Sequence, residues 1–453
     1  MNLKVLKKIT YSSAFLVASL FAQDQQNNFE IEILLPENIT VPGSIDLISA
    51  VKKSLAYHPQ VKKSFNAQGA VQQDIYIARS DYLPSIDVRA AWGRENSQTE
   101  TIENEGDYHR TLTRTEYGMT LRQMLFDGHK TRYAVEKQEA FYEGAQYDTE
   151  ESKHQLALRA IESYLELLRV AEQVDLAKSN VKGHQEIFDI VKVRNDKGLA
   201  KKSDLIQVKG RTSLAIAQLE REQARLQSVV ERYVEAVGEL PARKLVQPKM
   251  MNSKIPEKLS KAKQKAVLHH PSLLANRHRV RAFSAGIEEA KGSYYPRIDI
   301  ELSGGQNDNL AGAEGLDEHY MAMLVLSYNI YRGGGDRAAV ISQVYQRERQ
   351  KEEESELKLA VLRDLAISWY AREGKLVELK YFIEHMFTSE ETLKAYRIEY
   401  ERAERTLFDL LNARSEFFRS KATVIDTKYT NILSSYQILA NMGTILEDLQ
   451  LND

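Results

Sequence analysis

The sequence predicts a mostly α-helical chain with four short β-strands, in which one structural unit occurs twice. Three observations support this fold class: an internal repeat with constant spacing, two long tracts without proline, and four runs with alternating apolar residues. Of the 453 residues, 43% are hydrophobic and 28% are charged, which is typical of a folded chain with a core. The net charge of -2 gives no indication of a nucleic-acid partner.

The N-terminus has the parts of a secretory signal peptide. Three lysines lie within the first eight residues, residues 9–21 are mostly apolar, and Ala22 is a small residue before the expected cleavage site. The apolar run is too short to cross a membrane comfortably, so we expect residues 1–22 to be removed rather than to remain as an anchor. Residues 23–43 then form an N-terminal linker. No later stretch of about 20 apolar residues occurs, so any membrane-spanning part must consist of strands.

An internal repeat is the most informative feature of the sequence. Matching segments recur at a shift of 212 residues in the first part of each copy and at 205 residues further along. The change requires one loop that differs in length by seven residues between the copies. The pairs at the first shift are His58-Pro59 with His270-Pro271 and residues 82–88 with 294–300. The pairs at the second shift are Phe126-Asp127-Gly128 with Tyr331-Arg332-Gly333 and Ser203-Asp204-Leu205 with Phe408-Asp409-Leu410.

Each copy has the same predicted order of elements: a helix with an X-Pro break, two strands, and a long helical hairpin. The first copy, residues 44–241, has a helix at 45–80, strands at about 85–93 and 115–126, and a hairpin tip near 198–204. The second copy, residues 257–445, has a helix at 257–292, strands at about 297–305 and 320–331, and a tip near 403–409. An inter-repeat linker, 242–256, joins the copies, and residues 446–453 form a C-terminal tail.

Alternation in the strands predicts a sheet with one apolar and one polar face. In the first strand, for example, Ile86 and Val88 alternate with Asp87 and Arg89. Strands of this length can cross a bilayer when tilted. Four strands cannot close a barrel and open edges are not tolerated in lipid, so a membrane protein of this design must associate. Two copies of the chain would supply eight strands and three copies twelve, and a soluble protein with two decorated β-hairpins is the alternative.

The long tracts predict antiparallel helical hairpins. No proline lies between Pro84 and Pro241, and none follows Pro296. Apolar residues in these tracts have coiled-coil-like spacing, as from Leu158 to Leu168. Residues 128–197 would extend roughly 100 Å as one helix, which is far longer than the mean helix of globular proteins.

Several kinds of chemistry are excluded or unsupported. The chain has no cysteine, which excludes disulfides, thiolate metal sites, a cysteine nucleophile and a lipidated N-terminal cysteine. The glycines at 333–335 are not followed by the Lys-Ser/Thr of a phosphate-binding loop, and no G-x-S-x-G motif occurs. We therefore expect no enzyme activity, no catalytic residue, no cofactor and no metal site.

The chain resembles the TolC family of outer-membrane efflux and type I secretion channel proteins over residues 44–445. The stretch from Tyr400 to Ala413 is similar to the second hairpin tip of that family, and Gly198 to Leu205 is similar to the first. The resemblance implies a homotrimer with a shared 12-stranded β-barrel in outer-membrane lipid and an α-barrel that projects into the periplasm. It also implies a passive exit duct of a tripartite export system, for type I protein secretion, small-molecule efflux or both. Its partners would be a periplasmic adaptor (membrane fusion) protein and an inner-membrane ABC exporter or proton-driven pump.

The same resemblance suggests residues for a periplasmic gate, namely Asp204, Tyr400, Arg405, Asp409 and Asn412. It implies that Asp204 pairs with Arg405 and hydrogen-bonds Tyr400, and that Asp409 lines a constriction where a ring of aspartates attracts cations. Asn412 stands where the family often has a second aspartate, which predicts a weaker negative ring. From the residues alone, Asp204 and Asp409 can also be helix N-caps.

The tips are also the expected docking surface for the adaptor. The candidate contact residues are Gly198, Leu199, Asp204, Arg405, Thr406 and Leu407. Leu199 and Leu407 can instead pack within the bundle. Ala403 replaces the usual glycine of the second tip, so that turn is expected to be harder to form or differently shaped. The alternative function is a periplasmic coiled-coil scaffold or adaptor without a pore, against which the two pairs of bilayer-length strands argue.

Overall fold

The computed structural model of the protein describes residues 44–99, 102, 109–242, 244–248 and 250–451. Gly43–Asp453 forms one compact unit, to which the following description applies. The predicted signal peptide and N-terminal linker lie outside the described residues. None of the helices in the described part of the chain is long and apolar enough to cross a membrane.

The helix that begins each repeat is divided at its X-Pro pair. Helices α2 (Leu47–Tyr57) and α3 (Pro59–Ser80) meet at His58, and helices α7 (Leu259–His269) and α8 (Pro271–Lys291) meet at His270. Both histidines have extended backbone, with ψ of 133° and 120°, because proline disfavours a helical residue before it. Each proline then begins the next helix, where its missing N–H costs no hydrogen bond. The predicted break is confirmed in both copies.

A four-stranded antiparallel sheet follows these helices. Its order is β2 (Ser85–Ser97), β3 (Arg110–Phe126), β5 (Arg297–Asp308) and β6 (Leu316–Ser327). A short 3₁₀ helix, η2 (Gly292–Tyr294), precedes β5, and another, η3 (Leu310–Gly312), lies between β5 and β6. The fourth strand ends at Ser327, so the prediction of residues 320–331 was wrong by four residues at each end. Ser327 pairs with Arg297, the first residue of β5 after a proline, and β6 therefore has no partner beyond it.

The two faces of the sheet differ as predicted. Cross-strand pairing places Ile86, Leu121 and Leu302 in one apolar row. The opposite face carries ion pairs between neighbouring strands, which satisfy charges there. These pairs join Arg89 to Glu116 at 4.0 Å and Arg122 to Glu301 at 3.2 Å.

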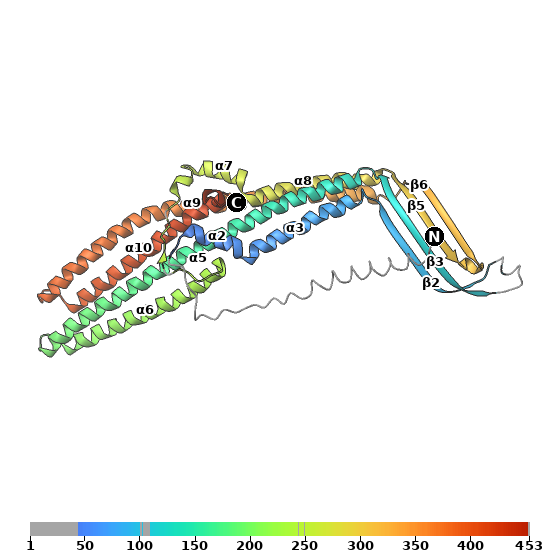
Figure 1. The fold of residues 1–453 in the computed structure, drawn as a ribbon. Helices are drawn as coiled ribbons and strands as arrows, with labels where there is room; N and C mark the ends of the chain where they lie inside the picture. Colours follow the sequence, from blue (N-terminus) through green and yellow to red (C-terminus); the bar gives the residue numbers. More distant parts are fainter. Residues whose placement is uncertain (1–43, 100–101, 103–108, 243, 249, 452–453) are drawn as a thin grey trace. The chain divides into compact units, whose positions relative to one another are not determined.

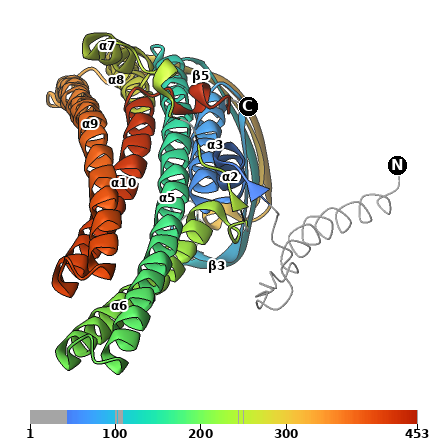
Figure 2. The same cartoon turned by 90° about the vertical axis from the view of Figure 1, so that its left-hand side faces the viewer.

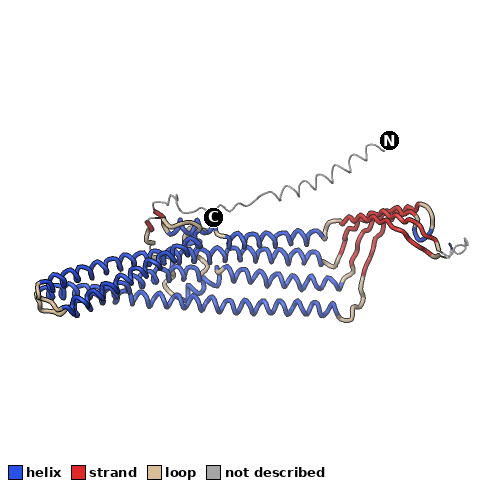
Figure 3. Tube along the Cα trace, turned by 90° about the horizontal axis from the view of Figure 1, so that it is seen from below, coloured by secondary structure: helices blue, strands red, loops and turns tan. Residues whose placement is uncertain are grey.

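Two long helical hairpins form the other end of the unit (Figures 1 and 2). The first consists of α5 (Lys130–Asp196) and α6 (Lys202–Val237), and the second of α9 (Gly335–Glu401) and α10 (Leu407–Asn441). Helices α5 and α9 each have 67 residues and begin at residues 130 and 335, which is the 205-residue shift of the repeat. Figure 3 shows α3, α5, α8 and α9 running side by side toward the strands, in the same order as the strands themselves.

The start of the first repeat and the inter-repeat linker both take part in the central core. Strand β1 (Ser44–Ile45) pairs in parallel with β4 (Lys244–Leu245) of the inter-repeat linker, which continues into the 3₁₀ helix η1 (Asn252–Lys254). The Tyr164 hydroxyl of α5 lies 2.9 Å from the Ile45 carbonyl oxygen and 2.7 Å from that of Val246. Helix α11 (Ile445–Asp448) begins at the last residue of the predicted second repeat and continues into the predicted C-terminal tail, where Leu446, Leu449 and Leu451 are buried in the same core. The described part of the tail is therefore packed structure.

Candidate functional site

The candidate site consists of the two turns that join α5 to α6 and α9 to α10. Both turns close the preceding helix with the same hydrogen bonds: the amide of Leu199 donates to the Arg194 carbonyl at 2.7 Å, and that of Glu404 donates to the Glu399 carbonyl at 2.9 Å. This geometry requires a left-handed residue, which is Gly198 with φ of 73° and Ala403 with φ of 64°. The second turn is therefore not differently shaped. Alanine adopts the glycine conformation there, at a cost of about 1 kcal/mol.

The helix that follows each turn starts differently. Thr406 is the N-cap of α10: its hydroxyl accepts from the Asp409 amide at 3.3 Å and donates to the Asp409 carboxylate at 2.7 Å. The N-cap of α6 is Lys201, which makes no side-chain capping bond. Asp204 and Asp409 both lie in the first turn, so neither is an N-cap residue, although a carboxylate there favours the positive end of the helix dipole.

Arg405 has a partner on its own hairpin. Its Nε donates to Glu399 at 2.8 Å, and its guanidinium lies 4.2 Å from the centre of the Tyr396 ring. Among the described residues, Asp204 has no side-chain hydrogen bond or ion pair. A single chain therefore does not contain the Asp204–Arg405 pair, and a pair between neighbouring chains stays a prediction.

An apolar cluster joins the two tips of one chain. It combines residues from all four hairpin helices, namely Ile187, Val191, Val208, Tyr400, Leu407, Leu410 and Leu411. Tyr400 and Leu407 are 6% and 5% exposed, whereas Leu199 is 70% exposed. Leu407 thus packs within the bundle, and its assignment to the docking surface was wrong. Leu199, in contrast, is free to contact a partner.

Arg194 is a tip residue that the sequence analysis missed. From α5, its Nη1 donates to the Tyr400 carbonyl at 2.9 Å, and its guanidinium lies 5.0 Å from the centre of the Tyr400 ring. Burial raises the pKa of Tyr400; Arg194 acts against this and the Asp204 carboxylate adds to it. The repeat held a signal for Arg194, because the 205-residue shift relates it to Glu399, a residue of opposite charge in the second tip.

A polar hollow of about 430 Å³ lies between α9 and α10 just above the second tip. Asp409 and Asn412 both line it. Their position at a pore constriction stays a prediction. Glu416 lines the same hollow one turn further along α10, and its carboxylate is 3.0 Å from Nε2 of His385. The hollow therefore has a second carboxylate, which the comparison of Asn412 with the family pattern did not reveal.

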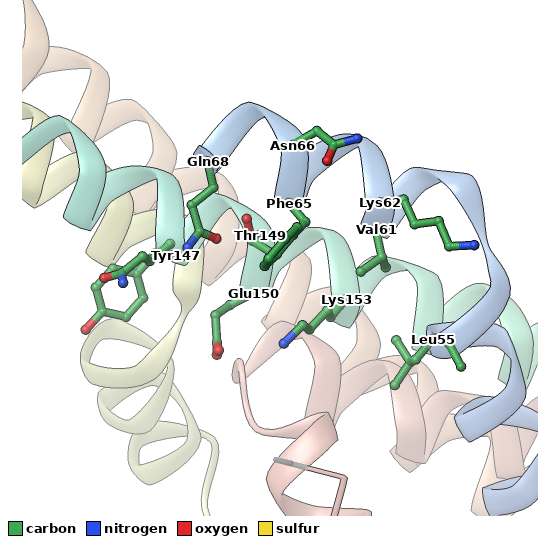
Figure 4. Close-up of a pocket in the computed structure, with 12 residues that line it drawn as sticks. Leu55, Val61, Lys62, Phe65, Asn66, Gln68, Tyr147, Thr149, Glu150 and Lys153 are labelled. Carbon is green, nitrogen blue, oxygen red and sulfur yellow. The ribbon is translucent and has the colours of Figure 1, made fainter. Parts of the chain in front are cut away.

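A second hollow lies far from the tips, between α2–α3 and α5 (Figure 4). It has a volume of about 740 Å³ and mixes apolar side chains such as Phe65 with charged ones such as Glu150 and Lys153. Among the described residues, no group of three or more His, Asp or Glu side chains is arranged to hold a metal ion. The hollow presents no cluster of reactive groups, and we regard it as part of the lateral surface of the helical layer.

Comparisons with known proteins place this geometry in a family. The model of the outer membrane efflux protein family matches residues 50–239 and 262–444, one match in each half. The outer membrane efflux protein BepC of Brucella suis is 23% identical over 377 residues, which cover 83% of this chain and 80% of BepC. The alkaline protease secretion protein AprF of Pseudomonas aeruginosa is 21% identical over 423 residues, covering 90% of this chain and 86% of AprF.

Solved structures share the fold. A membrane protein from Pseudomonas aeruginosa has a TM-score of 0.78 at 19% identity, over 88% of this chain and 93% of that chain. The CmeC outer membrane channel of Campylobacter jejuni has a TM-score of 0.76 at 13% identity, over 94% and 95% of the two chains. With family matches across most of both repeats, the chain belongs to the outer membrane efflux protein family and forms an export channel of the outer membrane.

Proposed function

We propose that three copies of the chain close a single 12-stranded β-barrel and act as a passive exit duct. The observation that carries this proposal is the pair of open edges of the sheet. The outer strands β2 and β6 have 13 and 12 residues, and within the described part of the chain each pairs on one side only. Because unpaired backbone groups are not tolerated in lipid, β6 of one copy must pair with β2 of another.

The helical layer has open edges on the same two sides. Helix α3 is followed by β2 in the chain and β6 is followed by α9, and both helices present large exposed apolar side chains. Phe65 and Ile77 of α3 are 64% and 66% exposed, and Tyr345 and Leu359 of α9 are 72% and 71% exposed. Apolar surface of this extent indicates a partner. If the copies are related by one rotation axis, each copy covers the strand edge and the helix edge of its neighbour together, including the hollow beside Phe65.

The tips form the proposed periplasmic gate. Asp204 lacks a side-chain partner among the described residues, and the Arg405 side chain is 38% exposed beside Glu399. We assign the Asp204–Arg405 pair to neighbouring chains, where it would hold the tips together. Asp409, Asn412 and Glu416 would then line the constriction, and their carboxylates would favour cations. A confined ion pair is stronger than one at an open surface.

The exposed part of the tips is the proposed docking surface for a periplasmic adaptor. Gly198, Leu199, Asp204, Arg405 and Thr406 remain its candidates after the removal of Leu407. An ABC exporter or a proton-driven pump of the inner membrane would supply the energy for export. The names of the relatives include both protein secretion and efflux, so the proposed cargo class covers both.

Two measurements on the mature protein in detergent test this proposal. The chain has no cysteine, so Val88→Cys in β2 with Leu324→Cys in β6 supplies two thiols for a bifunctional cross-linker. A ladder that ends at three chains is expected, and a ladder that ends at two would contradict the trimer. In planar bilayers, the Arg405→Ser and Tyr400→Phe double variant should conduct more than the wild type. A large wild-type conductance that the substitutions leave unchanged would contradict the gate.

A further inference from the structure

An arginine of the second hairpin contacts the first hairpin, about two helical turns after the start of α10 and about four turns before the end of α5. Arg414 of α10 donates from Nη2 to the carbonyl oxygens of Ser179 at 2.6 Å and Asn180 at 3.4 Å in α5. Its guanidinium lies against Gly183, where a Cβ atom would meet Arg414 Cζ at 1.9 Å. We call this position of the guanidinium, against Gly183 and the carbonyls of Ser179 and Asn180, the Gly183 seat. Any side chain at position 183 would exclude the guanidinium from it.

The seat partly shields the charge of Arg414 from water. The Nε atom of Arg414 is buried and has no hydrogen-bond partner among the described residues. Burial lowers the pKa of Arg414, while Glu186 acts in the opposite direction and Arg397 in the same direction as burial. Arginine nevertheless keeps its charge in proteins, so its charge-assisted bonds to α5 are among the stronger contacts available here.

Two other cations lie near the seat: Arg397 acts on Arg414, and Arg211 acts on the neighbouring His184. His184, next to Gly183, is 4% exposed, and burial lowers its pKa to about 4, with Arg414 and Arg211 acting in the same direction. His184 is therefore neutral at physiological pH. Of the charged groups nearby, Arg397 is bound to Glu186 at 3.4 Å. The guanidinium of Arg414 is thus fixed by backbone carbonyls rather than by a titrating side chain.

We propose that Arg414 in the Gly183 seat is a positioning residue for the gate. It fixes α10 against α5 above the tips and so sets where the two turns of one chain stand relative to each other. The tip cluster and Arg194 join the hairpins below this point. Farther from the tips, Gln173 of α5 binds Asp426 of α10 and Glu172 binds Lys428, so the seat is one of several polar contacts above the tip cluster. Loss of the seat would let the second hairpin shift against the first and raise the open fraction of the pore. This inference rests on the proposed gate.

Two measurements distinguish an effect on the position of the hairpins from an effect on the opening of the gate. Spin labels at Leu199→Cys and Glu404→Cys report the distance between the tips, because the chain has no other thiol. Planar-bilayer recordings report the open fraction. Gly183→Ala and Arg414→Ala should each broaden the tip-to-tip distances and raise the ratio of open to closed time roughly tenfold, the change expected from the loss of one charged hydrogen bond. Gly210→Ala is the matched control, because its Cβ meets nothing within 4 Å.

The double variant tests whether the two residues act as one unit. Gly183→Ala combined with Arg414→Ala should be no worse than either change alone, and Arg414→Lys should retain part of the wild-type behaviour because its ammonium can reach one carbonyl. A lower thermal midpoint with unchanged distances and conductance would overturn the proposal and leave only a packing contact. Altered distances with unchanged conductance would keep the positioning role of Arg414 and overturn the gate.

Discussion

The two hairpin tips have the same backbone and different side chains. Gly198 and Ala403 take the same left-handed conformation, and the same hydrogen bonds close both turns. Arg194 in the first tip corresponds to Glu399 in the second, and the first helix start is uncapped where Thr406 caps the second. Duplication thus preserved the geometry of the turn, whereas the charges diverged. The second tip contains the Arg405–Glu399 ion pair, whereas Arg194 of the first tip binds Tyr400 of the second.

The largest expected effect on the contact between the two tips comes from removing Arg194. Arg194→Ala should destabilise the association of the two tips by roughly 1.5–3 kcal/mol, because the Tyr400 carbonyl loses a charged donor and the ring loses its cation. Amide hydrogen exchange of residues 396–404 should become faster, and Arg194→Lys should lie between the variant and the wild type. Unchanged exchange in Arg194→Ala would show that the apolar cluster alone holds the tips together.

Exchanging the left-handed residues tests whether the two turns are equivalent. Ala403→Gly should stabilise the second turn by about 1 kcal/mol, and Gly198→Ala should destabilise the first by a similar amount, since only glycine is unstrained at positive φ. Hydrogen exchange of each turn measures both changes. Effects of the same sign at the two positions would contradict the equivalence.

The smallest expected effects come from the helix starts. Thr406→Ala should destabilise the start of α10 by about 1 kcal/mol through loss of the cap, and Lys201→Thr should slow exchange at the start of α6 by supplying one. Exchange of the first-turn amides is the measurement. If Lys201→Thr leaves the α6 amides unchanged, the difference between the helix starts lies elsewhere than in the cap.

The sequence predicted the features that local chemistry determines. The X-Pro breaks follow from proline, the strand faces from alternation, and the hairpins from long tracts without proline. The limits of the fourth strand depended on where its partner β5 begins, which alternation cannot show. The Arg194–Tyr400 and Arg414–Gly183 contacts join residues more than 200 positions apart on different helices, so no local pattern revealed them. Leu407 was misassigned because an apolar residue beside a turn can face either the cluster or solvent.

The ion pair between neighbouring chains is the central claim about the tips, and exchange of its charges tests it most directly. Single-channel conductance would be recorded for Asp204→Arg, Arg405→Asp and the variant with both changes, with Glu399→Gln as the control for the partner within the chain. We expect each single change to raise the conductance, the combination to restore the low wild-type value, and Glu399→Gln to leave it unchanged. A combined variant that conducts at least as much as the single variants would contradict the pairing of Asp204 with Arg405.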